Sequence, residues 1–357
     1  MTTYPMTDSK NISTEYHSIL VVDDIESIRY SIKDYLSREF RAYAAADGFE
    51  AVRICKNQPI DLVITDIRMP GMGGLQLIKI LSEQYPRMKF ALMTAYSVDD
   101  YIEFVRNQKV WNIIPKSTSM DLNFVRVMAH KLLTNDIFGI QQYYPRATLE
   151  DLKISDIHRM HRNLDDNEGL APDHFYTCRI ATPEENNAIC DMAGDLLAHS
   201  GAPSMVRLVL EELAANAMIH APNRPGDERP RPQNRPGMPN GEYIPMAEED
   251  AFDISFGIVE DNAIVAITDY HGTVNREEIL YRLERQVTPD PATGLPLGLV
   301  DTHGRGLYIS REQADHLIFN IDPGHRTEII GVLPLGPRAR NRAIAIFQRE
   351  SAPARAD

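Results

Sequence analysis

The sequence has few cysteines, a deficit of positive charge and no apolar stretch long enough to cross a membrane. Its three cysteines are odd in number and lack metal-ligand spacing, which predicts reduced thiols in a cytoplasmic protein. A formal net charge of −14 argues against a general binder of nucleic acid or of acidic membrane surfaces. We therefore expect a cytoplasmic protein without direct nucleic-acid or membrane contacts.

A length of 357 residues allows two or three domains, and a hydrophobic fraction of 43% is ordinary for packed globular domains. The first residues lack the apolar core of a signal peptide, so we expect a short mobile tail over 1–16. Beyond that tail, the chain contains two ordered sets of polar residues, and each set predicts a different kind of site.

Four short apolar runs in the first 120 residues each end in a polar side chain. The runs cover 18–22, 61–65, 90–93 and 110–115 and are separated by helical patterns, which predicts a parallel α/β sheet. The carboxyl ends of such strands meet at one edge, where open α/β folds place their sites. Carboxylates gathered there repel one another without a divalent cation, and hard oxygen ligands suit Mg²⁺. The residues that end the runs are Asp23 and Asp24, Asp66, Thr94 and Lys116.

This pattern resembles the receiver domain of two-component response regulators over residues 17–135. The resemblance implies a doubly wound, flavodoxin-like sheet and an upstream sensor histidine kinase. It also implies that Asp66 accepts the phosphoryl group, that Thr94 is the switch hydroxyl and that Lys116 pairs with the acyl phosphate. A metal must screen a carboxylate nucleophile from the incoming phosphate. The implied Mg²⁺ ligands are Asp23, Asp24, Asp66 and the backbone carbonyl of Arg68.

Two positions depart from the family pattern and leave an alternative open. Ser117 stands where the family usually has proline, and Ile113 stands where it has an aromatic switch residue. The phosphorylation chemistry is therefore expected to be intact, while the conformational relay is altered. The alternative is a receiver fold that has become a constitutive docking module.

The chain after the receiver is expected to form a connector and a second α/β domain. An apolar stripe predicts a last receiver helix that runs on toward 137–140, and we read 136–172 as a helical connector. Strands are expected at 175–180, 252–259, 263–268, 316–321 and 327–333, and helices at 184–199, 204–221, 276–285 and from 305. The proline- and arginine-rich stretch 222–245 reads as a flexible insertion, and 337–357 as a tail. The stripe consists of Leu122, Val125, Met128, Leu132 and Leu133.

The second set of polar residues begins on the helix expected at 204–221. Glu212, Asn216 and His220 recur every four residues and so lie on one helix face. Asp269 ends a later strand and precedes Gly272 by three residues. Glycines that open a helix let backbone N–H groups approach a phosphate, and the helix dipole favours that anion. The glycine-containing helix start consists of Gly304, Arg305, Gly306 and Leu307.

This set resembles the GHKL (Bergerat) ATPase fold, an α/β sandwich, and specifically its anti-sigma factor serine-kinase branch, over 173–336. The resemblance implies ATP and Mg²⁺ as cofactors, Glu212 as general base and a lid over about 286–303. Asp269 would accept the adenine amino group, and His271 departs from the glycine that the family has two residues after this aspartate. The implied cofactor-binding residues are Asn216, His220, Asp269, Gly272, Gly304, Arg305, Gly306 and Leu307, with Asn216 also a Mg²⁺ ligand.

Three functions from different classes fit these patterns. The first is a response regulator whose output is an ATP-dependent serine/threonine protein kinase acting on an anti-sigma antagonist. The second is a binding module that holds ATP and sequesters a sigma factor or its antagonist. The third is a hybrid histidine kinase that would use His130 and Thr134, although Lys131 stands where an acidic residue is expected. A DNA-binding output is disfavoured by charge and by the lack of a fitting third domain. A homodimer is compatible with all three.

Overall fold

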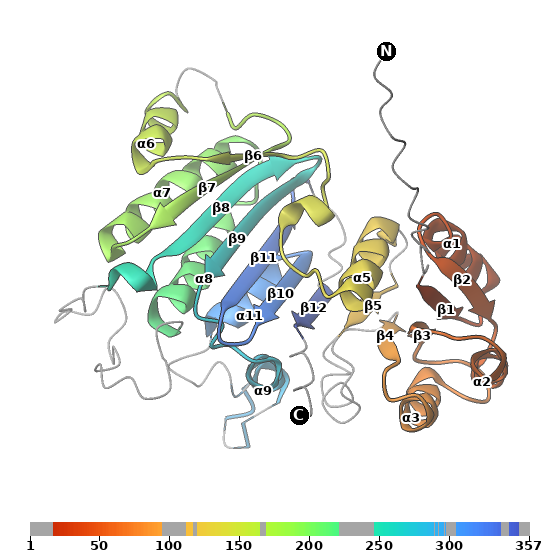
Figure 1. The fold of residues 1–357 in the computed structure, drawn as a ribbon. Helices are drawn as coiled ribbons and strands as arrows, with labels where there is room; N and C mark the ends of the chain where they lie inside the picture. The colour runs from red at the N-terminus through yellow and green to blue at the C-terminus, as the bar shows by residue number, and fades with distance from the viewer. Residues whose placement is uncertain are drawn as a thin grey trace, which may run out of the picture.

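The computed structural model describes residues 17–94, 112–116, 120–164, 169–220, 246–288, 290–291, 293–295, 297, 305–336 and 343–349. These residues form two β-sheets, each covered by helices, and the chain passes from one to the other through a short connecting segment (Figure 1). Within this described part, no helix is long and apolar enough to cross a membrane.

The first sheet contains five parallel strands in the order β2-β1-β3-β4-β5. That order is the doubly wound, flavodoxin-like arrangement expected from the sequence. Helices α1 and α5 pack on one face, while α2 and α3 pack on the other. Because both faces are covered, β1 and β3 are buried along their whole length and are mostly apolar. The elements are β1 (Ser18–Val22), α1 (Glu26–Leu36), β2 (Arg41–Ala45), α2 (Gly48–Asn57), β3 (Leu62–Asp66), α3 (Gly74–Gln84), β4 (Lys89–Thr94), β5 (Ile113–Pro115) and α5 (Leu122–Thr134).

The second sheet contains seven strands in the order β12-β10-β11-β9-β8-β7-β6 and is mixed. Its central strands pair antiparallel, whereas β12 runs parallel to β10 and β6 runs parallel to β7. The elements are η2 (Ile140–Gln142), β6 (Thr148–Asp151), α6 (Ile154–Arg162), β7 (His174–Ile180), α7 (Pro183–His199), α8 (Val206–His220), η4 (Glu248–Asp250), β8 (Phe252–Val259), β9 (Asn262–Asp269), α9 (Arg276–Val287), α11 (Arg305–Gln313), β10 (His316–Asp322), β11 (Arg326–Pro334) and β12 (Ala343–Gln348).

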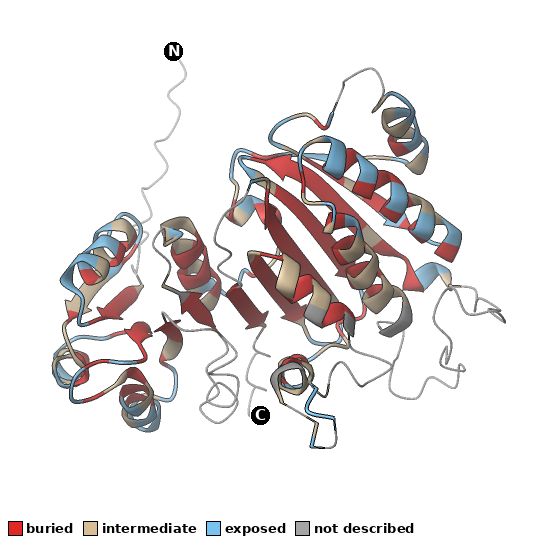
Figure 2. Ribbon diagram, turned by 180° about the vertical axis from the view of Figure 1, so that it is seen from behind, coloured by how far each residue is buried: buried red, intermediate tan, exposed pale blue. Residues whose placement is uncertain are grey.

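Helices α7, α8 and α11 cover one face of the second sheet, with their buried sides turned toward the strands (Figure 2). Helix α7 begins at a capping box, in which the Thr182 hydroxyl accepts the Glu185 N–H and Pro183 occupies the first turn. Helix α8 buries the apolar stripe predicted from its sequence and keeps Glu212 and Asn216 on a partly exposed side. The buried residues of that stripe are Val206, Val209, Leu213 and Ala217.

The opposite face of the second sheet carries α5 and the segment 135–147, and we call this contact region the junction. The segment crosses the sheet face away from α8 and α11 (Figure 1). Buried side chains from α5 and the segment share one core with side chains of β10, β11 and β12. The bridge between Asn112 and Ala345 also joins the edge of the first sheet to β12. Helix α5 therefore belongs to both cores, which explains why its apolar stripe is longer than one domain needs.

Three expectations about this region were wrong. The last helix of the first domain ends at Thr134, where Asn135 adopts a left-handed conformation, and does not continue to 137–140. The region 136–172 is not wholly helical, because β6 adds a strand to the sheet within it. The region 337–357 is not only a tail, because β12 pairs with β10 and is almost completely buried. Expectations for 1–16 and 222–245 lie outside the described residues.

The three cysteines are free, as their number and spacing predicted, and all three are buried. Burial raises the pKa of Cys55 and of Cys178 to about 11, and that of Cys190 to about 12. Thiols with such pKa values carry almost no thiolate at neutral pH, so they pack as small apolar side chains.

Candidate functional site

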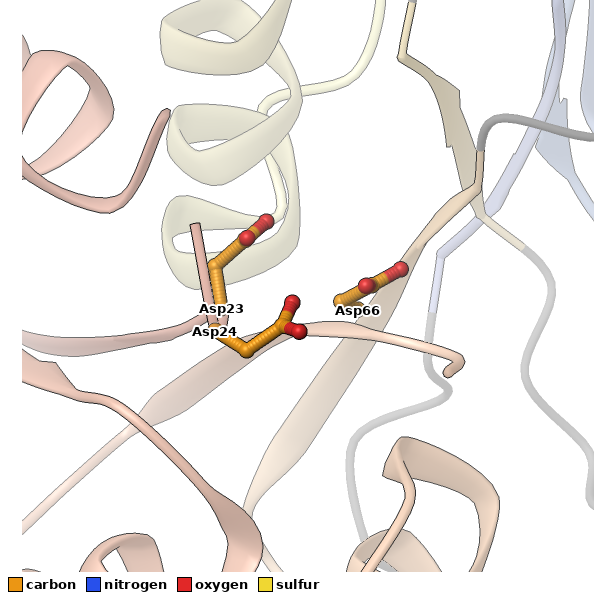
Figure 3. Close-up of side chains that lie close together, drawn as sticks. All are labelled: Asp23, Asp24 and Asp66. Carbon is orange, nitrogen blue, oxygen red and sulfur yellow. The ribbon is translucent and has the colours of Figure 1, made fainter. Parts of the chain in front are cut away.

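Three carboxylates meet at the carboxyl edge of the first sheet. Asp23 and Asp24 follow β1, and Asp66 ends the neighbouring strand β3. One oxygen of each lies within 4.8 Å of the others, and the side chains extend into the same region (Figure 3). Asp23 and Asp66 are buried, whereas Asp24 is exposed. The site therefore has buried oxygen ligands on one side and faces solvent at Asp24. Mg²⁺ is commonly bound in this way, by carboxylates on one side and by water molecules on the other.

A buried ammonium group lies between two of these carboxylates. Lys116 Nζ is 2.7 Å from Asp23 Oδ2 and 2.9 Å from Asp66 Oδ2. The other oxygen of Asp23 accepts the backbone N–H of Ile25 at 2.9 Å, which orients the carboxylate. Strand pairing produces this meeting, because β4 joins β3 to β5 and Lys116 follows β5 directly. The backbone N–H of Lys116 donates to the carbonyl of Thr94, which ends β4 and is buried.

Burial raises the pKa of Asp66, and the nearby Lys116 opposes that rise. The carboxylate of Asp23 acts in the same direction as burial, since two negative charges close together disfavour ionisation. A divalent cation among the three carboxylates would reverse this balance and keep Asp66 ionised. The residues present therefore fit a magnesium ion, with Asp23, Asp24 and Asp66 as its carboxylate ligands.

The loop after β3 is held close to the site by glycine. A Cβ atom on Gly74 would lie 2.0 Å from the carbonyl oxygen of Asp66, so only glycine permits this approach. Gly71 has a φ of +76°, which also favours glycine. Met69 and Met72 are buried and anchor the loop in the core. Arg68 lies in this loop and its side chain is exposed. Its backbone carbonyl stays a predicted magnesium ligand.

A second group of the residues singled out in the sequence meets on the helical side of the second sheet. Helices α8 and α11 pack against each other, which brings Gly306 against Glu212. A Cβ atom on Gly306 would lie 2.0 Å from Glu212 Oε2. Asn216 follows one turn later on the same partly exposed side of α8, and Leu307, a residue of α11, is buried. Two segments nearly a hundred positions apart in sequence therefore form one surface with a carboxylate and a glycine helix start.

Asp269 ends β9 and has a defined orientation. Its Oδ1 accepts the backbone N–H of His271 at 3.0 Å and that of Gly272 at 3.1 Å. Gly272 has a φ of +59°, and a Cβ atom there would lie 2.2 Å from the carbonyl oxygen of Asp322. Burial raises the pKa of Asp269, while the two backbone N–H groups act against the rise. The carboxyl group is therefore fixed at the end of the strand by its own turn.

Sequence reasoning missed two buried polar groups. His271 Nε2 lies 3.2 Å from Asp250 Oδ1, and both side chains are buried. Lys131 is also buried and contacts Asn320 across the junction. No sequence signal marks either group, since both depend on partners far away in the chain. Gly304, the side chains of Arg305 and His220, and much of the lid expected at 286–303 lie outside the described residues.

Known proteins resemble the first domain. Residues 19–125 match the family described as the response regulator receiver domain. The DNA-binding transcriptional regulator NtrC of Proteus hauseri is 35% identical over 107 residues, which are 29% of this chain and 22% of NtrC. Sporulation initiation phosphotransferase F of Bacillus subtilis (strain 168) is 33% identical over 86 residues, which are 24% of this chain and 69% of that protein.

A solved structure of the response regulator protein TrrA from Thermotoga maritima, in complex with Mg(2+)-BeF, is 33% identical. The match covers 33% of this chain and 99% of the TrrA chain, with a TM-score of 0.30. The chain spans only about a fifth of the length of the first curated relatives, NtrC and the response regulator protein FleR of Pseudomonas aeruginosa.

Proposed function

The chain belongs to the response regulator receiver family, and from this premise we propose that phosphorylation of Asp66 controls an ATP-dependent output in its second domain. The receiver half of this proposal rests on the meeting of Asp66 with Lys116 and two further carboxylates. The output half rests mainly on the contact between Glu212 and Gly306.

In the receiver, Asp66 is the nucleophile. One carboxylate oxygen attacks the phosphorus of a phosphohistidine on a sensor kinase, the phosphorus–nitrogen bond breaks, and an acyl phosphate forms on Asp66. Lys116 then exchanges its contact with the Asp66 carboxylate for one with the phosphoryl oxygens. A bound Mg²⁺ would screen the negative charges of the donor and the site. Thr94, which is buried at the end of β4, would bond the phosphoryl group once it arrives.

The output domain is proposed to bind Mg-ATP and to phosphorylate a protein hydroxyl, in the manner of anti-sigma factor serine kinases. Glu212 would take the proton of that hydroxyl, whose oxygen attacks the γ-phosphorus while ADP leaves. Asn216 would hold the metal ion on the phosphates, and Asp269 would accept the adenine amino group. Gly306 lets the start of α11 approach Glu212, because a side chain there would strike that carboxylate. The N–H groups at this helix start would then bind the phosphates.

The identity of the phosphoacceptor residue is tested by measuring the mass of the intact protein. Wild type, Asp66→Asn and the exposed-site control Asp34→Asn are treated with a small phosphodonor and Mg²⁺, and intact mass is measured. Wild type and Asp34→Asn are expected to gain one phosphoryl group, and Asp66→Asn none. Equal labelling of all three proteins, or of none, would reject Asp66 as the acceptor.

The output is tested by nucleotide titration and phosphate transfer on the full chain. Asn216→Ala and Asp269→Asn are expected to weaken binding of a fluorescent ATP analogue by about tenfold or more, since each removes a polar contact with the nucleotide. Glu212→Gln is expected to abolish transfer to a serine-bearing antagonist while sparing nucleotide binding. Wild type that binds ATP and an antagonist without transfer would favour the sequestering module instead. The partner's identity, dimerisation and cytoplasmic location stay predictions.

A further inference from the structure

A buried lysine crosses the junction between the two domains. Lys131 belongs to α5 and is 1% exposed, and its Nζ donates a hydrogen bond to Asn320 Oδ1 at 3.1 Å. The rings of Tyr143 and Phe347 lie 4.5 and 5.0 Å from the same nitrogen. Lys131 therefore has one polar acceptor from β10 and two aromatic faces, one from the segment 135–147 and one from β12.

Asn320 also forms a hydrogen bond with a buried carboxylate. Its Nδ2 donates to Glu328 Oε2 at 2.7 Å, and the two residues are direct cross-strand partners in β10 and β11. The backbone N–H of Gly139 also donates to Glu328 Oε2, at 3.0 Å. Gly139 has a φ of +95°, a conformation that favours glycine. The amide of Asn320 thus bridges the amine of Lys131 from the first domain and the carboxyl group of Glu328 from the second.

This Lys131–Asn320–Glu328 network depends on alignment. A buried polar or charged group is costly unless its hydrogen-bond partners are correctly placed. The members come from α5, β10 and β11, and the aromatic faces come from the segment 135–147 and from β12. A rotation or translation of α5 would strip Lys131 of its acceptor without giving it water. The network therefore fixes one register of α5 on the sheet.

The network is also close to Asp269 through the backbone of a single strand. Glu328 follows Thr327, and Thr327 is the direct cross-strand partner of Asp269. Adjacent residues of a strand point to opposite faces, so Glu328 faces the junction while Thr327 faces the helical side. Both residues are buried. If β11 moves at Glu328, the neighbouring Thr327 moves with it. The pairing of Thr327 with Asp269 would then change as well.

The other end of the network leads to the phosphorylation site. Helix α5 packs on α1 and on β3, the strand that ends in Asp66. The bridge from Asn112 to Ala345 adds a second contact between the receiver and β12. A change in the receiver that moves α5 or β5 must therefore either move the second sheet or break the junction.

We propose that Lys131, through Asn320 and Glu328, is the positioning residue that couples the receiver to the end of β9 at Asp269. The nucleotide role of Asp269 rests on the proposed function, but the mechanical coupling does not. Lys131 links α5 to the second sheet. While this link is intact, a movement of α5 in the receiver also moves β10 and β11. Without the link, only the apolar contacts and the Asn112–Ala345 bridge remain, and β10 and β11 respond much less to the receiver.

The coupling is tested by hydrogen exchange on the full chain, with and without Mg²⁺ and beryllium fluoride as the acyl-phosphate mimic. The variants are Lys131→Met, which keeps the length and apolar stem, and Lys131→Arg, which keeps the charge. Lys79→Met is the control, since Lys79 is exposed on α3. Loading is expected to change amide exchange across 316–334 by at least fivefold in wild type, Lys79→Met and, in part, Lys131→Arg. Lys131→Met is expected to show less than a twofold change.

A wild type whose exchange across 316–334 ignores loading would overturn the proposal, and so would a Lys131→Met protein that responds like wild type. Glu328→Gln is the second variant if Lys131→Met fails to fold, and it is expected to lose the response in the same way. A parallel titration with a fluorescent ATP analogue separates the two proposals. Absence of nucleotide binding in every protein rejects the ATP-dependent output, while the exchange data still decide the coupling.

Discussion

Lys116 Nζ lies 2.9 Å from Asp66 Oδ2 and thereby occupies the position from which the proposed phosphate contact is made. The same ammonium holds the buried Asp23 at 2.7 Å. In the unphosphorylated protein it is thus the counter-charge that allows two carboxylates to be buried side by side.

We predict that Lys116→Met destabilises the receiver and makes its stability depend on Mg²⁺. Removing one partner of a buried ion pair costs about 3–5 kcal/mol, because the other charge stays buried without compensation. Mg²⁺ should restore much of this lost stability and should stabilise the variant more than wild type.

Thermal unfolding of wild type and Lys116→Met with EDTA and with Mg²⁺ measures both effects. Lys33→Met, at an exposed pair with Asp34, should change stability by less than about 1 kcal/mol. An equal response to Mg²⁺ in Lys116→Met and wild type would contradict the prediction.

Asp66→Asn is expected to stabilise the metal-free protein at neutral pH. The pKa of Asp66 is raised above 3.8 in the fold, mainly by burial. Between 3.8 and the raised pKa, the native carboxyl keeps a proton that the unfolded one has lost, so stability falls as pH rises through that window. Asparagine does not ionise, so the variant avoids the loss of stability caused by the buried charge. The gain in stability over wild type should shrink as the pH approaches 4. The unfolding midpoint in EDTA from pH 4 to 7 is the measurement. A difference from wild type that does not vary with pH would argue against a raised pKa.

Gly306→Ala should separate nucleotide chemistry from folding. The added Cβ would lie 2.0 Å from Glu212 Oε2, and that carboxylate can move aside because it ends a flexible side chain. We expect normal folding and normal Asp66 labelling, with phosphate transfer reduced by about 100-fold because the general base is displaced. Gly336→Ala is the matched control, since a Cβ there meets nothing within 4 Å. Transfer that survives in Gly306→Ala would remove Glu212 from the proposed mechanism.

The junction should become more stable as pH rises from 7 to 9. Burial lowers the pKa of Lys131 from 10.5 to about 7, against the opposing charges of Glu328 and Asp136. Between these values the unfolded state binds one proton more, so stability rises with pH by at most about 1.4 kcal/mol per unit. Burial also raises the pKa of Tyr143 well above 10, so that group stays neutral in this range.

Urea unfolding of wild type and Lys131→Met at pH 7, 8 and 9 measures the effect. The difference between the two proteins isolates Lys131, because all other groups titrate in both. We expect the difference to grow in favour of wild type with each step in pH. A difference that stays constant would mean that the lysine keeps its charge in the junction.

The receiver was predictable because its signals are local. Each strand is a short apolar run, and each run ends in the polar residue that the sheet carries to its edge, as Asp66 and Thr94 do. Helix α8 was equally predictable, because its buried stripe follows the helical period. In both cases the pattern that forms the element also places the candidate site residues.

The wrong predictions concern residues whose structure depends on partners far away in the sequence. Strand β6 is exposed along its length and is a strand only because β7 supplies its hydrogen bonds. Strand β12 is an alanine- and isoleucine-rich run within a basic region, and its burial comes from β10 and α5. Lys131 looks like a surface residue of an amphipathic helix, yet Asn320 and Phe347 enclose it.

The position of β12 in the sequence has a consequence for biosynthesis. The strand follows every other element of the two sheets, so the ribosome completes the receiver long before β12 exists. A receiver that folds before β12 is made has its β5 edge and the Lys131 side of α5 open to water, and Lys131 is then hydrated and charged. Pairing of β12 with β10 then brings the Phe347 ring over the Lys131 nitrogen. A ribosome that stalls before β12 would thus display a folded receiver whose junction surface is still uncovered.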